Sequence, residues 1–100
     1  MGQVEEDASF VVRSPNRTIV LQRLADGAAI PAQIRNDTEL EYSRISESTN
    51  TLRDRGLVEL LVDDETKRGR LYAVSDRGRD ALEFMKQNGM LDEEEEYGRR

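Results

Sequence analysis

The segment EYSRISESTNTLRDRGLVELL, residues 41–61, carries the clearest structural pattern in this sequence. Counted at about 100° per residue, its apolar and small side chains return to one side of a helix until a glycine interrupts the pattern. The side expected to face inward holds Ile45, Thr49 and Leu52, with Ser48 at its edge. Ser43 is a suitable N-cap for this helix and Gly56 a suitable C-cap. An apolar run of strand length, residues 57–62, follows at once.

Two helices are expected before this segment. A Ser-Pro pair at residues 14–15 favours a helix start, and Asp-Gly at residues 26–27 favours its end. A shorter helix begins near Ile-Pro at residues 30–31 and ends in the turn-forming run NDTELE, residues 36–41. The apolar stretch at residues 10–12 could be a strand or an arm.

A hairpin and a last helix are expected after the segment. Residues 57–62 and 70–74 have the apolar and β-branched composition of strands, and the polar run DDETKRG, residues 63–69, joins them. Ser75 then caps a helix that ends at the Asn-Gly pair of residues 88–89. The order of elements predicts a single α+β domain.

Length and composition limit what such a domain can do. One hundred residues correspond to one domain. The sequence contains no run of about 18 apolar residues, the length that would span a membrane. Cysteine and histidine are both absent, which excludes disulfides, zinc sites built on these ligands and histidine-based catalysis. We expect no cofactor and no enzyme, since catalysis would have to rest on carboxylates, lysine or tyrosine. The lack of cysteine also suits a cytoplasmic protein.

The net charge of −6 is concentrated near the two ends of the chain. Residues 5–7 are all acidic, and residues 92–100 contribute a net −3, whereas residues 8–91 hold thirteen acidic and thirteen basic side chains. We expect residues 1–8 and 92–100 to be disordered acidic segments around a domain at residues 9–91. The acidic N-terminus also lacks the basic and apolar regions of a signal peptide.

The basic residues are unusual in kind, because only two of the fifteen are lysine. An acidic, lysine-poor composition resembles proteins of salt-accumulating archaea, where high salt screens the repulsion between negative charges. An ordinary acidic protein from a mesophile is the alternative.

Three stretches of the sequence resemble the winged helix-turn-helix family, in particular MarR-like and ArsR-like regulators and small haloarchaeal homologues. They are RTIVLQRLADG at residues 17–27, SRISESTNTLRDRGLVE at residues 43–59 and GRLYAVSDRGRDAL at residues 69–82. The Arg-Gly-Leu-Val junction and the Tyr-x-x-Ser-x-x-Gly step are the most specific parts. The resemblance implies a three-helix core, a β-hairpin wing and a C-terminal helix. The chain departs from the family at residues 29–31, where Ala-Ile-Pro replaces a capping serine or threonine.

The resemblance places the helix at residues 43–55 in the major groove of DNA. Its polar side chains suit that role, because asparagine can pair with adenine, arginine with guanine or phosphate, and glutamate with cytosine. Asparagine, serine and threonine are poor helix formers, so their presence on a helix face that only contacts water would be unexpected. The candidate base-contacting residues are Arg44, Ser46, Glu47, Asn50 and Thr51.

The hairpin loop is a second candidate surface. Lys67, Arg68 and Arg70 could contact the DNA backbone or the minor groove. The three acids at residues 63–65 offer the alternative of a solvated tip with local charge pairing.

Other arginines also have two interpretations. Arg17 could contact a phosphate. Arg77 and Arg79 open the last helix, where cations are unfavourable. An external anion, or the nearby Asp76 and Asp80, would explain their position, and we favour the aspartates.

These expectations predict a sequence-specific regulator of transcription that binds double-stranded DNA as a homodimer, with no evident small-molecule effector. Met85, Met90 and Leu91 are candidates for the dimer interface, as are residues 10–12. The alternative is a winged helix that binds another protein, since a fold does not determine a function. An exposed apolar patch on the helix at residues 43–55 or on the wing would favour that alternative.

Overall fold

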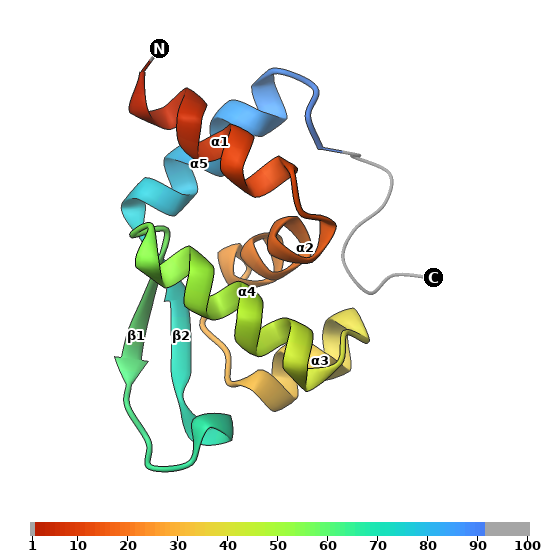
Figure 1. Ribbon diagram of the computed structural model, residues 1–100, viewed down its shortest axis with the longest axis vertical. Helices are drawn as coiled ribbons and strands as arrows, with labels where there is room; N and C mark the ends of the chain where they lie inside the picture. The colour runs from red at the N-terminus through yellow and green to blue at the C-terminus, as the bar shows by residue number, and fades with distance from the viewer. Residues whose placement is uncertain (1, 92–100) are drawn as a thin grey trace.

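The computed structural model describes residues 2–91, with only the backbone described at Lys67. Within this range the chain forms five α-helices and one two-stranded antiparallel sheet (Figure 1). The elements are α1 Gln3–Val12, α2 Pro15–Ala25, α3 Pro31–Thr38, α4 Tyr42–Asp54, β1 Val58–Val62, the 3-10 turn η1 Lys67–Gly69, β2 Leu71–Val74 and α5 Asp76–Gln87. This is the predicted α+β winged helix-turn-helix with one further helix at its start. No helix in the described range is long and apolar enough to cross a membrane.

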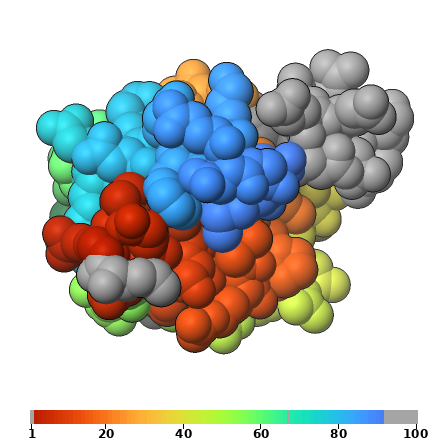
Figure 2. Space-filling view, turned by 90° about the horizontal axis from the view of Figure 1, so that it is seen from above, coloured from red at the N-terminus to blue at the C-terminus, as the bar shows by residue number. Residues whose placement is uncertain are grey.

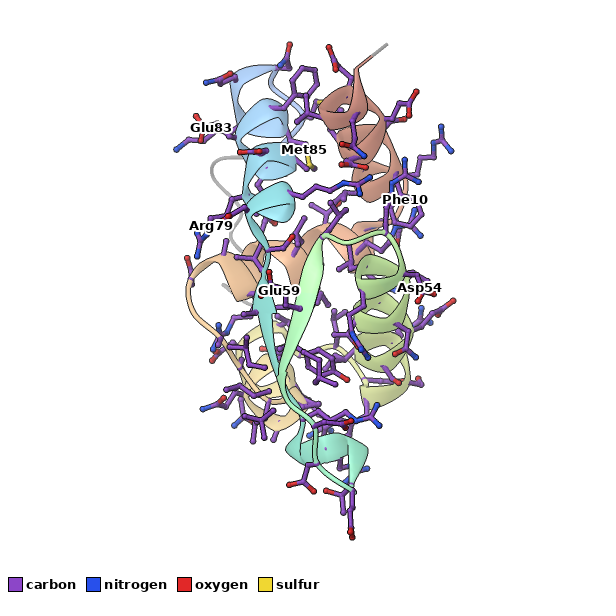
Figure 3. All side chains as sticks on the ribbon, turned by 90° about the vertical axis from the view of Figure 1, so that its left-hand side faces the viewer. Phe10, Asp54, Glu59, Arg79, Glu83 and Met85 are labelled. Carbon is purple, nitrogen blue, oxygen red and sulfur yellow. The ribbon has the colours of Figure 1, made fainter. Side chains whose placement is uncertain are left out.

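One apolar core holds the helices together. Its fully buried side chains come from all five helices and from the start of the wing, and they include Val11, Leu21, Leu24, Ile34, Ile45, Leu52, Leu57 and Met85. Met85 points from α5 toward α1 (Figure 3). Burial of Ile45, Ser48, Thr49 and Leu52 confirms the inner side that was predicted for the helix at residues 43–55.

The N-terminal segment differs from the prediction. Residues 3–8 belong to α1, so the disorder expected for residues 1–8 is wrong there, and residues 10–12 are helical and form neither a strand nor an arm. Ala8 and Val11 lie one turn apart and are fully buried, because α1 packs against α5 at the end of the molecule opposite the wing (Figure 1). The predicted tail at residues 92–100 lies outside the described residues.

Two of the three predicted serine caps are confirmed. Ser14 and Ser75 each accept a hydrogen bond from the backbone N–H three residues further on, at 3.2 and 3.0 Å. Ser43 does not cap α4, which begins one residue earlier, after Glu41. At α3, which lacks a capping hydroxyl, the side chain of Gln33 accepts a hydrogen bond from the N–H of the N-cap residue at 3.0 Å.

The junction between α4 and β1 depends on two glycines. Gly56 has a φ of +83°, and across it the N–H of Leu57 donates to the carbonyl of Leu52 at 2.9 Å. A Cβ atom on Gly78 would lie 2.2 Å from the carbonyl oxygen of Leu57, so glycine alone lets α5 approach the junction. The hydroxyl of Ser75 donates to the carbonyl of Gly56 at 2.6 Å. The two most specific motifs of the resemblance therefore meet at one point in the structure.

The wing is the hairpin of β1 and β2. Its antiparallel register shifts between Leu60 and Val62, which leaves Leu61 in a bulge. Two backbone hydrogen bonds between Ala29 and Tyr72, of 2.9 and 3.0 Å, attach β2 to the segment between α2 and α3. The wing is thus tied to the helix-turn-helix at its base.

Candidate nucleic-acid interface

Helix α4 crosses one face of the molecule beside the wing, and its outer side carries the predicted base-contacting residues (Figure 1). Arg44, Glu47 and Asn50 are exposed, and Ser46 and Thr51 are half-buried at the edges of this side. The hydroxyl of Thr51 donates to the backbone carbonyl three residues earlier at 3.1 Å. Its oxygen can still accept a hydrogen bond, so Thr51 keeps one way to contact a base or a phosphate.

Glu47 has a neighbour that the sequence did not indicate. Burial lowers the pKa of Arg17, Arg13 lowers it further, and Glu47 partly offsets both effects. The Arg17 guanidinium donates to the carbonyl oxygen of Phe10 and lies 4.0 Å from the centroid of its ring. Arg17 is therefore engaged within the fold, and these contacts give no support to the phosphate contact considered for it.

The three wing cations lie in different surroundings. The Arg68 guanidinium lies 4.1 Å from the centroid of the Tyr42 ring, in the first turn of α4. Nε of Arg70 lies 3.0 Å from a carboxylate oxygen of Asp63, as the local charge-pairing alternative expected. Lys67 lies in η1, where the structure describes only its backbone. Of the two described side chains, that of Arg68 contacts α4, whereas that of Arg70 pairs with Asp63.

Tyr42 and Arg35 are site candidates that sequence reasoning missed. The Arg35 guanidinium, on α3, lies 5.2 Å from the centroid of the Tyr42 ring, so it shares that ring with Arg68. None of Arg35, Arg44 and Arg68 forms an ion pair within residues 2–91. Three elements bring these residues together, and no local sequence pattern could have shown it.

The other end of α4 is held by a buried carboxylate. Asp7 of α1 is 1% exposed and accepts hydrogen bonds from Nε of Arg77 at 2.7 Å and Nε of Arg55 at 2.9 Å. The hydrogen bond from Arg77 lowers the pKa of Asp7, burial opposes this, and Arg55 adds to the lowering. The same bond raises the pKa of Arg77. Arg77 therefore pairs with Asp7, and the pairing expected with Asp76 or Asp80 is wrong.

An open pocket of about 270 Å³ lies between α1 and the C-terminal end of α4. It is lined by Glu6, Ser9, Phe10, Arg13 and Arg55. Residues 2–91 contain no group of three acidic side chains placed to hold a metal ion.

The chain matches no protein-family model and no curated protein sequence. It does resemble solved structures. NMB1585, a MarR family regulator from Neisseria meningitidis, matches with a TM-score of 0.66 and 23% identity, over 76% of this chain and 54% of that one. Reduced HlyU from Vibrio cholerae matches with a TM-score of 0.62 and 21% identity, over 84% of this chain and 90% of that one. A variant of ZitR from Lactococcus lactis matches with a TM-score of 0.60 and 13% identity, over 81% and 64%.

At sequence identities of 13–23%, the similarity to these structures is evidence for the fold alone. It confirms the predicted α+β winged helix-turn-helix, and one of the matching structures is a MarR family regulator, as the resemblance in the sequence suggested. The chain spans about half the length of the Neisseria regulator and about two thirds of the Lactococcus protein.

Proposed function

We propose that this chain is a cytoplasmic, sequence-specific DNA-binding regulator of transcription without enzymatic activity. The observation that carries the proposal lies at the start of α4. There, exposed hydrogen-bonding side chains stand beside Arg35, Arg44 and Arg68, which have no carboxylate partner within residues 2–91. Base edges require hydrogen-bonding side chains and phosphates require cations, and this surface offers both. The fold shared with a MarR family regulator supports the proposal.

In this proposal α4 enters the major groove. Asn50 pairs with adenine, Arg44 contacts guanine or phosphate, and Glu47 accepts a hydrogen bond from cytosine. Ser46 and Thr51 add contacts from the edges of the helix. In the wing, Arg68 is the foremost backbone contact, Lys67 adds a second charge, and Arg70 contributes less because Asp63 holds it.

We also propose a homodimer that pairs through the α1 and α5 end. This end lies opposite the wing, so pairing there leaves α4 free for DNA (Figure 1). Figure 2 shows α1, α5 and residues 88–91 side by side on this face. Val11 and Met85, both considered for the interface, are fully buried in the core and cannot form it. Exposed Val12 and half-buried Phe10, Met90 and Leu91 remain as candidates.

One observation favours the rival function, a module that binds another protein. Leu61 is 52% exposed and Val62 is 49% exposed, and they are consecutive on β1. Adjacent exposed apolar side chains on a strand suit a protein partner better than they suit water. If the chain binds another protein through this pair, replacing both residues with serine should abolish that binding. A DNA-binding regulator should keep its affinity for DNA after the same change.

A selection from random duplexes tests the proposal. Wild-type protein is used to enrich duplexes, and its affinity for the enriched duplex and for a scrambled one is measured by fluorescence anisotropy. We expect an enriched motif bound at least about a thousandfold more tightly than the scrambled duplex at moderate salt. The double variant Leu61→Ser with Val62→Ser should bind like the wild type. Absence of enrichment at every salt concentration would contradict the proposal.

A further inference from the structure

We propose that Arg35, Tyr42 and Arg68, here named the Tyr42 clamp, hold one or two adjacent phosphates of the DNA backbone beside α4. Within the clamp Tyr42 is a positioning residue, whose ring seats the two guanidiniums that touch the phosphates. This inference rests on the proposed DNA binding, and it assigns Arg35, a residue outside both α4 and the wing, a phosphate contact shared with Arg68.

The geometry of the clamp joins three elements. Arg35 comes from α3, Tyr42 from the first turn of α4 and Arg68 from η1. The two guanidiniums lie 5.2 and 4.1 Å from the centroid of the same ring. An aromatic face attracts a cation, so the half-buried Tyr42 ring favours both arginines in this position.

Two carboxylates close to the clamp in sequence are held by other arginines. Asp37, two residues after Arg35, lies 2.7 Å from Nε of Arg23. Asp63 at the start of the wing loop pairs with Arg70. Both arginines of the clamp are exposed and keep their N–H donors free of ion pairs within residues 2–91.

Two like charges on one ring repel each other, and the ring alone does not neutralise them. An anion between or beside them removes the repulsion, and a phosphate group matches the planar fork of guanidinium donors. The clamp lies where the wing turns back toward the start of α4, so a phosphate there borders the groove that α4 would enter. The observed cluster is therefore arranged as a backbone contact.

The test uses the complete chain and measures affinity for an enriched duplex and an unrelated duplex across a salt series. Arg35→Ala and Arg68→Ala should weaken binding to both duplexes by the same factor, since phosphates carry no sequence. Each should also lower the slope of log K against log salt by about 0.9 for every phosphate that the protein no longer neutralises. Arg53→Ala, an exposed arginine in the last turn of α4, is the matched control and should leave the slope unchanged.

Tyr42 is tested by two substitutions. Tyr42→Phe keeps the ring and should bind like the wild type, whereas Tyr42→Leu should bind both duplexes about two- to fivefold more weakly, the equivalent of an exposed cation–π interaction. Melting temperatures of all variants separate this effect from unfolding. A loss of affinity for Tyr42→Phe as large as that for Tyr42→Leu would overturn the role of the ring.

The outcomes distinguish the clamp from the function on which it rests. If the wild type binds DNA and Arg35→Ala keeps its affinity and salt slope, the clamp is wrong and the proposed function stands. If the wild type binds neither duplex at any salt concentration, both are overturned. Parallel losses of affinity for Arg35→Ala and Arg68→Ala, with Arg53→Ala unaffected, support the clamp.

Discussion

The carboxylate of Asp7 lies 2.7 Å from Nε of Arg77, seventy residues further along the chain. Its other oxygen accepts a hydrogen bond of 2.9 Å from Nε of Arg55, the C-cap residue of α4. One buried acid thus joins α1, the first turn of α5 and the end of α4. The placement of α4 on the domain therefore depends on a residue near the N-terminus.

We predict that Asp7→Asn lowers the free energy of unfolding by about 1.5–3 kcal/mol at neutral pH, the range for hydrogen bonds to a charged group. The neutral amide cannot offer two charged acceptors to the two arginines. Chemical denaturation of the variant measures the change. Glu6→Gln, the exposed neighbour, is the control and should change stability little. Equal effects of the two substitutions would mean that the pairing contributes nothing specific.

The same variant should reveal a pH dependence. The pKa of Asp7 is lowered from its ordinary value of 3.8 in the folded protein, chiefly by the hydrogen bond from Arg77. Ionised Asp7 therefore stabilises the fold above that value, and this contribution is lost as the pH falls through the lower folded-state pKa. The difference in unfolding free energy between wild type and Asp7→Asn should be largest near neutral pH and shrink on acidification. A difference that grows at low pH would contradict this pairing.

Gly78→Ala should destabilise the protein by about 1–3 kcal/mol, the usual cost of overpacking. The added Cβ would lie 2.2 Å from the carbonyl oxygen of Leu57 and 2.7 Å from a methyl group of Val74. Thermal unfolding measures the effect. Arg79→Ala, on the exposed side of the same helix, should leave the melting temperature nearly unchanged (Figure 3). A fully stable Gly78→Ala variant would show that α5 can retreat from the junction.

Asp63→Asn should tighten binding to specific and unrelated duplexes alike. Asp63 holds Arg70 at 3.0 Å, and removing its charge releases that guanidinium for a phosphate. Anisotropy at low and moderate salt measures the gain in affinity, which should vanish in the double variant Asp63→Asn with Arg70→Ala. If the gain persists in the double variant, it comes from the general decrease in negative charge.

A homodimer mass is predicted by sedimentation at high protein concentration. Val12→Asp, at the α1 and α5 end, should shift the equilibrium toward the monomer, because a charge would be buried in the proposed interface. Val62→Asp places the same charge on an exposed valine of the wing and should leave the dimer intact. A monomer at all concentrations would refute the pairing.

The features that the sequence predicted well are local ones. Ile45, Thr49 and Leu52 return once per helical turn, and Gly56 is the residue that a helix end in a left-handed conformation requires. Ser14 and Ser75 cap the helices that follow them, as predicted. Such a cap needs only a hydroxyl three positions before a free N–H, so a short stretch of sequence is enough to predict it. The order of the helices and the hairpin followed from such signals.

The features that the sequence did not predict depend on distant residues. The acidic run at residues 5–7 has the composition of a solvated tail, and only the fold brings Arg55 and Arg77 to Asp7. The Tyr42 clamp likewise requires the positions of α3, α4 and the wing at once. Ion pairs and cation–π contacts between distant residues produce no periodic pattern in the sequence, whereas the apolar face of a helix does.

The most direct test of the proposed DNA binding compares wild type and Asn50→Ala on the enriched duplex and on its single-base variants. Asn50 is exposed on the outer side of α4, and its amide is suited to adenine. We predict that Asn50→Ala weakens the binding free energy by about 1–3 kcal/mol and removes the base preference at one position, while Arg79→Ala binds as the wild type does. Unchanged affinity and unchanged base preference in Asn50→Ala would contradict the assignment of α4 as the helix that reads DNA.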